Sequence, residues 1–324
     1  MKVAIFIPYF IPPSGGLPNY FEYWQKSAAA NDKIDFFIPS NADSSQYTQY
    51  NNIHFITMGV NEFWDKIQDL LEFPIVRDYY KIGEYRPLCG LLFKDILNDY
   101  DYWGQSEFDL IYGDILKFIK RFLDRGEEVI GKWGHFRIIK NTDKLRMLPF
   151  ENACQIKHPL NMKEAFSTKF CCHWDEILGM GLRYYQAGVN VVSLSSIIAD
   201  INQYYKYFSI RKHGKWGFSW HEGTLIGYND KAERTDFLYA HFQKRILSVT
   251  NGDIPDSKFC IVPNRIVNGY DHSAEINSGT ALYTLKTKIN YYKKMMKGLT
   301  EINMQLRMAC LETYQYCINH GLIR

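Results

Sequence analysis

The chain has 324 residues, of which 46% are hydrophobic and 23% are charged, so it is long enough to bury a large core. A formal net charge of +3 provides no strong field for polyanions, and we expect no nucleic-acid partner. The seven cysteines, an odd number without C-x-x-C spacing, are typical of reduced thiols in a cytoplasmic protein.

The N-terminal residues predict the first strand of a buried sheet. Residues 1–11 resemble a short secretory signal, but the apolar run contains Pro8 and lacks a small-residue cleavage site. Residues 3–10 are instead typical of a strand that is covered on both faces. The elements expected next are a helix over 17–30 capped by Asn19, strands over 34–38 and 53–58, and an amphipathic helix over 62–73. This alternation predicts an α/β fold with a mostly parallel sheet.

The loop after the first strand is a candidate ligand site. Ligands of open α/β sheets bind beyond the carboxyl ends of the strands, so Pro8, Tyr9 and Phe10 are predicted to line a nucleotide-base pocket. A plain connecting loop is an equally good interpretation. Glu84 and Arg86 precede a helical pattern over 88–97 and are expected to face the same crevice. The Arg86 fork could bind a phosphate, although arginines more often lie at the surface.

Two carboxylates interrupt an apolar segment at residues 100–114. Glu107 and Asp109 lie one residue apart at the predicted end of a strand, where alternation would send both to the same side. Buried carboxylates need a partner, and Mg²⁺ or Mn²⁺ shared with a substrate diphosphate would satisfy them. The alternative is a salt-bridged acidic turn.

The second half carries two further groups of polar residues. Asp175 and Glu176 follow His173 in an acidic cluster that could supply an acid-base group or form a salt-bridged turn. His241 and Lys244 lie in an apolar frame over 236–245, so a metal-binding imidazole and a phosphate-binding cation could come from one element. The other elements expected are a helix over 114–124, a strand or hairpin over 129–140 in which Gly131 and Gly134 allow close approach, strands over 189–194 and 260–267, and a basic aromatic segment over 204–217.

The chain after residue 281 is predicted to be helical, with apolar residues alternating with lysines. Such a helix could lie on an anionic membrane surface, but packing on the domain is slightly favoured. No stretch reaches the roughly 18 apolar residues of a membrane-spanning helix.

At YRPLCGLLF, YDYWGQSEFDLIYGDI, WGHFRIIKN, HWDE and YAHFQKR, the chain resembles bacterial glycosyltransferase-like proteins of capsule and lipopolysaccharide loci. The resemblance covers roughly residues 1–250. It implies a GT-A-like fold, with a Rossmann-type, mostly parallel sheet over 1–250 that binds a nucleotide-sugar, followed by a mainly helical extension over 251–324.

The resemblance also assigns residues to roles. Glu107 and Asp109 match the D-x-D metal motif, with Glu where Asp is usual, so Asp109 is the firmer metal ligand and Glu107 a metal, ribose or water-bridged contact. His241 matches the histidine that completes the metal site, and Asp175 or Glu176 the catalytic base near the acceptor. The donor-binding residues predicted overall are Pro8, Tyr9, Phe10, Glu84, Arg86, Glu107 and Lys244.

The leading hypothesis is therefore a cytoplasmic, Mn²⁺- or Mg²⁺-dependent, hexosyltransferase-like enzyme. It would move a sugar from a nucleotide donor, with a UDP-sugar favoured, to a glycan or lipid-linked glycan. One alternative is a non-catalytic glycan- or nucleotide-binding protein that retains the fold. Another is a nucleotidyltransferase or phosphotransferase, but Ser14, Gly15 and Gly16 lack the following Gly-Lys of a phosphate loop.

Overall fold

The computed structural model describes residues 1–202, 205, 207–210, 213–243, 245, 247–249, 255, 257–269, 276, 289, 293 and 304–323. Lys244 and most of the basic segment after residue 281 lie outside the described residues.

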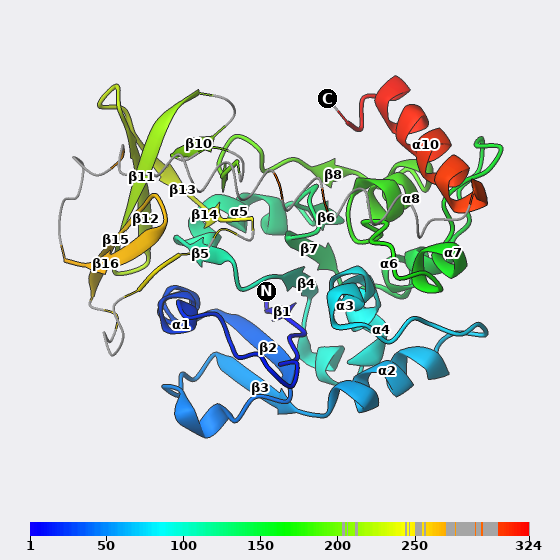
Figure 1. Ribbon diagram of the computed structural model, residues 1–324, viewed down its shortest axis with the longest axis horizontal. Helices are drawn as coiled ribbons and strands as arrows, with labels where there is room; N and C mark the ends of the chain where they lie inside the picture. Colours follow the sequence, from blue (N-terminus) through cyan, green and yellow to red (C-terminus); the bar gives the residue numbers. More distant parts are fainter. Residues whose placement is uncertain are drawn as a thin grey trace.

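A seven-stranded sheet forms the centre of the protein, in the order β3-β2-β1-β4-β7-β6-β8 (Figure 1). Strands β1 to β4 are parallel, and β7 runs antiparallel to both of its neighbours. This arrangement confirms the predicted mostly parallel α/β sheet flanked by helices. The strands are β1 (Val3–Phe6), β2 (Ile34–Ser40), β3 (Ile53–Thr57), β4 (Tyr102–Ser106), β6 (Val129–Ile130), β7 (Phe136–Lys140) and β8 (Val191–Val192).

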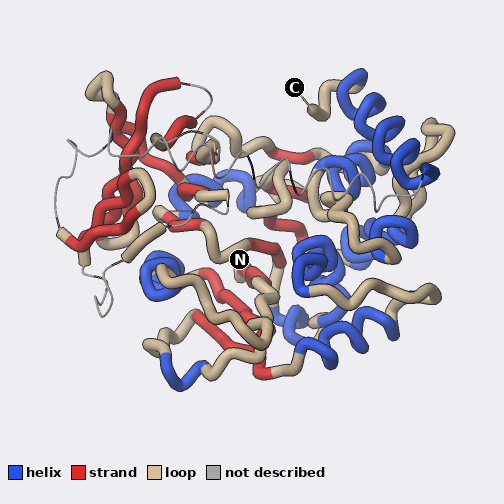
Figure 2. The backbone as a smooth tube through the Cα atoms, viewed as in Figure 1, coloured by secondary structure: helices blue, strands red, loops and turns tan. Residues whose placement is uncertain are grey.

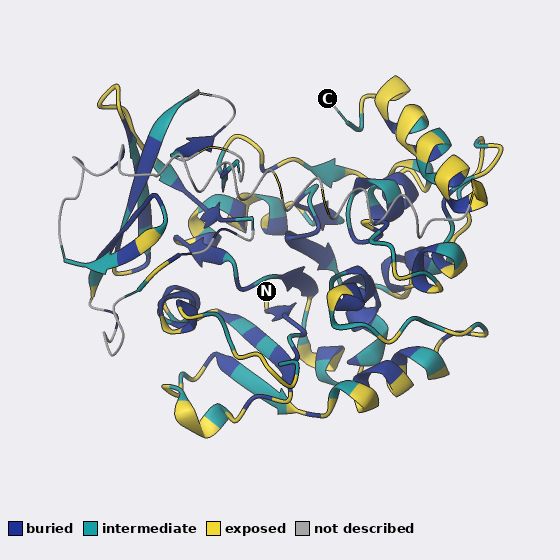
Figure 3. Cartoon of the chain, viewed as in Figure 1, coloured by how far each residue is buried: buried dark blue, intermediate teal, exposed yellow. Residues whose placement is uncertain are grey.

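Strand β1 is apolar throughout because both of its faces are covered. Val3 and Ile5 belong to one hydrophobic cluster, and Ala4 and Phe6 belong to another. The first cluster includes α1 (Phe21–Ala29) and α5 (Ile115–Asp124), and the second includes α2 (Val60–Asp69). All four side chains are nearly inaccessible to solvent (Figure 3). Continuous hydrophobicity in the sequence therefore reflects a two-sided core.

Two helix predictions need correction. Helix α1 begins at Phe21 without a side-chain cap, because the Asn19 amide donates to the Leu247 carbonyl at 2.7 Å instead. The helix predicted over 88–97 is interrupted, since α4 (Cys89–Leu92) is followed by a 3₁₀ turn over Ile96–Asp99, and α3 (Ile82–Tyr85) with a further 3₁₀ turn precedes it. The break lies at Phe93, whose φ of −120° and ψ of 33° are outside the helical range.

A second sheet packs on the other side of α1 (Figure 2). Its order is β13-β12-β11-β15-β16, with β10 beside β11. The ring of Tyr23 on α1 contacts Phe259 on β15 edge-on at 5.0 Å. Residues 258–268 pair with β11 and with each other, so they belong to a sheet whose other strands lie before residue 250. This sheet crosses the domain boundary expected at residue 250. The strands are β10 (Phe208–Ile210), β11 (His213–His221), β12 (Thr224–Asn229), β13 (Arg234–Phe237), β15 (Lys258–Val262) and β16 (Arg265–Asn268).

A small third sheet joins distant parts of the chain beside the end of β4. It consists of β5 (Leu110–Tyr112), β14 (Tyr239–His241) and β9 (Ala199–Asp200), with β14 in the middle. The register pairs His241 with Leu110 on one side and with Asp200 on the other. Leu110, Asp200 and His241, which are far apart in sequence, therefore lie side by side in this sheet.

The C-terminal helix α10 (Met304–Asn319) packs against the helical side of the protein (Figure 1). Thr313 Oγ1 accepts a hydrogen bond from the Leu160 backbone N–H at 2.9 Å, and the Cys317 side chain is buried with Ile177 and Leu182. The other α-helices in the part of the chain that the structure describes are α6 (Asp143–Met147), α7 (Met162–Phe166) and α8 (Leu182–Gln186). Among the described helices, none is both long and apolar enough to span a membrane.

Candidate active site

The two carboxylates of the E-x-D segment lie in the loop that joins β4 to β5. Phe108 between them is buried against Trp24 and Phe21, and it anchors the loop to the core. Glu107 and Asp109 both face His241, whose Nε2 lies 3.7 Å from Glu107 Oε2 and 3.6 Å from Asp109 Oδ2. The same-side arrangement expected from alternation is therefore present.

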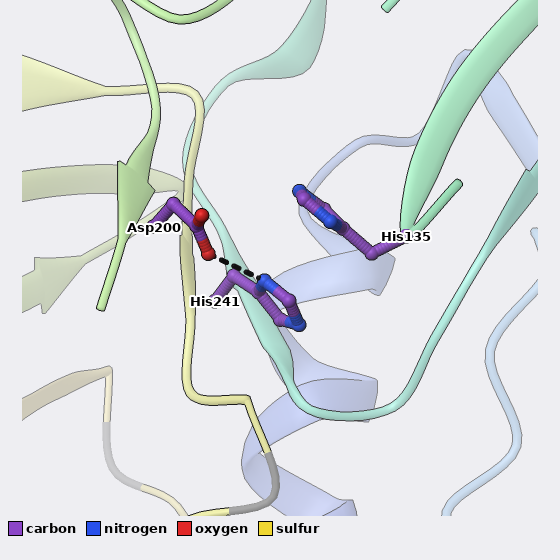
Figure 4. Close-up of side chains that lie close together, drawn as sticks. All are labelled: His135, Asp200 and His241. Atoms are coloured by element: carbon purple, nitrogen blue, oxygen red, sulfur yellow. Dashed lines mark hydrogen bonds and ion pairs between the residues drawn. The ribbon is translucent and has the colours of Figure 1, made fainter. Parts of the chain in front are cut away.

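His241 is held from its other ring nitrogen by Asp200. The distance from His241 Nδ1 to Asp200 Oδ1 is 2.8 Å (Figure 4), and the Gln243 amide donates to the same oxygen at 2.6 Å. His135 stacks on His241 with a ring-centroid distance of 4.0 Å and an interplanar angle of 27°. His135 Nε2 lies 3.0 Å from the hydroxyl of Tyr239. These contacts fix the plane of the His241 ring, so its Nε2 points to the two carboxylates.

The protonation of the stacked histidines reflects their neighbours. Burial acts to lower the pKa of His241, but Asp109, Asp200 and Glu107 outweigh it and raise that pKa well above its ordinary value. Burial and the adjacent charge of His241 lower the pKa of His135 to about 3. The protonated form of His241 is thus favoured beside the carboxylates, and the neighbouring His135 stays neutral.

The chemistry of this ligand set fits a divalent cation. An oxygen from Glu107, an oxygen from Asp109 and a ring nitrogen of His241 lie within 4.8 Å of one another. Carboxylate oxygens are the ligands that Mn²⁺ and Mg²⁺ prefer, and the imidazole can complete the set when it is neutral. His135, Asp200 and His241 form a second group of the same size. There the hydrogen bond between Asp200 and His241 already occupies Nδ1, which is the arrangement of a carboxylate that orients a metal-binding histidine.

Arg86 connects the E-x-D loop to the second acidic cluster. Its Nη2 lies 2.5 Å from Glu107 Oε1 and 2.6 Å from Asp175 Oδ2, and its side chain is only 6% exposed. Burial acts to raise the pKa of Glu107, but Arg86 and His241 outweigh it and lower that pKa well below 4.5. Arg86 therefore neutralises two carboxylates from segments about 70 residues apart.

Asp175 and Glu176 approach the backbone at Gly134. The Gly134 N–H donates to Glu176 Oε2 at 2.8 Å. A Cβ at position 134 would lie 2.5 Å from Asp175 Oδ2, so the close approach expected at this glycine does occur. Burial, followed by the neighbouring charge of Asp175, raises the pKa of Glu176 to about 7. Glu176 is thus poised to exchange a proton near neutral pH.

Glu84 and Lys81 hold the segment that precedes Asp175. The Glu84 carboxylate pairs with the fully buried Lys81 and accepts the His173 N–H at 2.7 Å. The Lys81 ammonium also donates to the carbonyls of Ala165 and Phe170 at 2.7 and 2.9 Å. These bonds fix the segment that leads into Asp175.

Two cavities meet at the E-x-D segment. One, of about 610 Å³, is lined by Pro8, Tyr9 and Phe10, which the sequence predicted as a base pocket. The other, of about 520 Å³, is lined by Glu84, Asp175, Glu176 and His241. Both cavities share Tyr80, Gly83, Arg86, Glu107 and Asp109 in their walls. The predicted site residues that the structure describes therefore line one or both of these cavities, but Glu84, expected in the crevice beside Pro8, Tyr9 and Phe10, lines only the other one.

The chain matches the profile of DUF6625, described as a family of unknown function, over residues 5–269. The protein belongs to this family. No curated protein matches the chain.

Solved structures similar to this DUF6625 member include several glycosyltransferases. The galactosyltransferase LgtC, in complex with donor and acceptor sugar analogs, is 14% identical with a TM-score of 0.26, over 45% of this chain and 60% of that one. This chain therefore spans about 60% of the LgtC structure. Mouse xyloside xylosyltransferase 1 is 9% identical with a TM-score of 0.38, over 63% of this chain and 88% of that one. Protein A197 from STIV is 11% identical with a TM-score of 0.31, over 78% and 100%. These TM-scores are too low to carry an argument about function.

Asp200 and His135 were not singled out from the sequence. Asp200 follows the apolar run Ile197, Ile198 and Ala199, just as Glu107 follows strand β4. An acidic residue at the end of a strand could therefore have indicated Asp200. His135 lies in WGHFRIIKN without any spacing that marks it as part of a site.

Replacing Arg86 with Met should destabilise the protein by about 3–5 kcal/mol, because Glu107 and Asp175 would lose their shared cation in a buried place. Chemical denaturation at pH 7 measures this loss. Lys117→Met is the matched control, since its ion pair with Asp236 is exposed and should contribute less than about 1 kcal/mol.

The difference in stability between wild type and Arg86→Met should depend on pH. The pKa of Glu107 is lowered on folding, so its stabilising contribution is present above its ordinary pKa of 4.5 and is lost as pH falls through the lowered value. The difference between wild type and Arg86→Met should shrink below about pH 4.5. A difference that is equally large at pH 3 and pH 7 would contradict this account.

Proposed function

We propose that this protein is a metal-dependent glycosyltransferase that moves a sugar from a nucleotide-diphosphate donor to a hydroxyl of a glycan. The observation that carries the proposal is the position of the Glu107, Asp109 and His241 ligand set, which lies where two cavities meet. A transfer between two substrates needs two adjoining spaces and a centre of charge between them.

The cavity at the end of β1 suits the donor. Its wall contains Tyr9, whose partly exposed ring can stack on a base, and it leads to Arg86, Glu107 and Asp109. Phe10 also lines the cavity, but its ring is buried in the core against Phe63. In the proposal, Glu107, Asp109 and His241 hold Mn²⁺ or Mg²⁺. Such a cation, when bound, neutralises the charge that develops on the leaving diphosphate. Lys244, which lies outside the described residues, is proposed as a further diphosphate contact, and a UDP-sugar as the donor.

Glu176 is the better candidate for the base that an inverting transfer requires. Asp175 is occupied by Arg86 at 2.6 Å, whereas Glu176 has a pKa of about 7 and accepts only a backbone N–H among the bonds described for it. A base with a pKa near the working pH removes a proton from the acceptor hydroxyl most effectively. In a retaining transfer this role would not exist.

A surface glycan or lipid-linked glycan as acceptor and a cytoplasmic location belong to the same proposal. They are supported by the resemblance of the sequence motifs to proteins of capsule and lipopolysaccharide loci. Peripheral contact with a membrane through the basic segment after residue 281 is a separate proposal, since most of that segment lies outside the described residues.

Calorimetric titration of UDP and GDP tests the donor site, with and without Mn²⁺. One nucleotide should bind in a Mn²⁺-dependent manner, and Asp109→Ala should abolish that dependence because it removes a ligand from the set. Asp124→Ala is a control at an exposed aspartate on α5 that pairs only with Lys120 in the contacts described. The absence of nucleotide binding in the wild type would favour a non-catalytic binding protein.

Asp200→Asn should weaken Mn²⁺ binding by about 10- to 100-fold while all three ligands remain, because the His241 ring would lose its carboxylate partner. Electron paramagnetic resonance of free Mn²⁺ measures the affinity directly. Gln243→Ala leaves the Asp200 carboxylate in place and should have a smaller effect. Equal affinities for Asp200→Asn and wild type would remove Asp200 from the site.

In an inverting transfer, kcat/KM should rise with pH up to about 7, since Glu176 must be ionised to accept a proton. Glu176→Gln should lower kcat by about 10²- to 10⁴-fold, whereas Asp175→Asn should act mainly on stability. Initial rates between pH 5 and pH 9 provide the profile. A rate that is flat across this range would exclude Glu176 as the base.

A further inference from the structure

The cavity that contains Glu176 also has an aromatic and apolar wall that the proposed chemistry does not use. Its members come from four separate parts of the chain, the 79–81 turn, the β6–β7 loop, the turn at Ile177–Gly181 and the C-terminal segment. They are Tyr80, Trp133, Ile177, Leu178, Tyr314 and Ile323. A site for a metal and a base alone does not need such a wall.

Trp133 is directly linked to the proposed base. The next residue, Gly134, donates its N–H to Glu176 Oε2 at 2.8 Å and lies close to Asp175. The indole is partly buried and packs against the cluster that contains Ile177, against which the C-terminal residues Leu322 and Ile323 also pack. A ligand that contacts this indole in the cavity is therefore next to the carboxylate that would deprotonate it.

Tyr314 and Ile323 are held in the wall by the packing of α10. The helix is fixed to the domain by Thr313 and by the Glu312 carboxylate, which accepts the His158 N–H at 2.9 Å. After the helix, Gly321 adopts a positive φ of 70° and the Leu322 N–H returns to the Cys317 carbonyl at 2.9 Å. This turn brings Ile323 back to Ile177. Both wall residues lie beyond the family match, which ends at residue 269.

The combination of groups in this cavity suits a sugar ring. A pyranose has an apolar face of C–H groups, which stacks on aromatic rings, and hydroxyls around its edge, which need hydrogen-bond acceptors. The cavity offers Trp133, Tyr80 and Tyr314 for the face and the carboxylate of Glu176 for the edge, while Glu84 is already paired with Lys81 and with the His173 N–H. A nucleotide phosphate would be repelled by Glu176 in its ionised form.

We propose that Trp133 and Tyr314 form a stacking subsite for a neutral saccharide acceptor, with the C-terminal helix contributing to acceptor specificity. The subsite rests on the proposed transferase function and extends it, since it assigns the acceptor to the Glu176 cavity and the donor to the Tyr9 cavity.

Saturation-transfer NMR and titration with a panel of neutral methyl pyranosides test this subsite, in the presence of Mn²⁺ and UDP. At least one glycoside should bind, with saturation strongest on the protons of one ring face. Tyr314→Ala and Trp133→Ala should each weaken that binding by about tenfold or more and leave UDP affinity unchanged. Tyr185→Ala is the matched control, because Tyr185 is 43% exposed against 46% for Tyr314, contacts His320 edge-on near the same helix, and does not line the cavity.

Each outcome supports or overturns either the saccharide subsite or the proposed function. Glycoside affinities that are equal in wild type, Tyr314→Ala and Trp133→Ala would overturn the subsite. Binding of UDP without binding of any glycoside would also overturn it, while the donor half of the proposed function would stand. Failure of UDP to bind would instead be a failure of the proposed function. Thermal unfolding of each variant shows whether a loss of binding comes from misfolding.

Discussion

The site depends on how its buried negative charge is balanced. Among the described residues, Arg86 neutralises Glu107 and Asp175, Lys81 neutralises Glu84, and His241 lies between Glu107, Asp109 and Asp200. Carboxylates still outnumber cations, which is consistent with the raised pKa values of His241 and Glu176. Protons on His241 and Glu176 offset part of this excess, and the divalent cation of the proposed function would offset it further.

The three-stranded sheet is the device that brings these charges together. The register pairs His241 with Leu110 on one side and with Asp200 on the other. Backbone hydrogen bonds between strands therefore set the position of His241 relative to the Asp200 carboxylate and to the start of β5, which follows the E-x-D loop. Strand pairing fixes His241 and Asp200. The loop that carries Glu107 and Asp109 is held beside them by the buried Phe108 and by the Phe242 N–H, which donates to the Asp109 carbonyl at 2.8 Å. The stacked His135 limits rotation of the ring further.

The two cavities differ in chemistry on either side of this centre. The one at the end of β1 has aromatic walls and ends at Arg86 and the E-x-D segment, as expected for a ligand with a flat ring and an anionic part. The other combines carboxylates with aromatic rings from the β6–β7 loop and from α10. The C-terminal helix is thus part of a site wall as well as a cover for the helical layer.

The sequence by itself determined the α/β class, the strand that precedes the E-x-D segment, and most of the polar residues that meet at the site. Val3 to Phe6 could be assigned because a two-sided core requires unbroken hydrophobicity, and Glu107 and Asp109 stood out because carboxylates are costly in an apolar segment. Asn19 as a cap failed because a distant carbonyl, that of Leu247, took its amide. The tertiary structure alone decided that Asp200 supports His241, that Arg86 joins Glu107 to Asp175, and that Tyr314 reaches the same cavity as Glu176. Each of these contacts joins residues between 21 and 138 positions apart, where only strand register and packing set the distance, and local pattern carries no information about either.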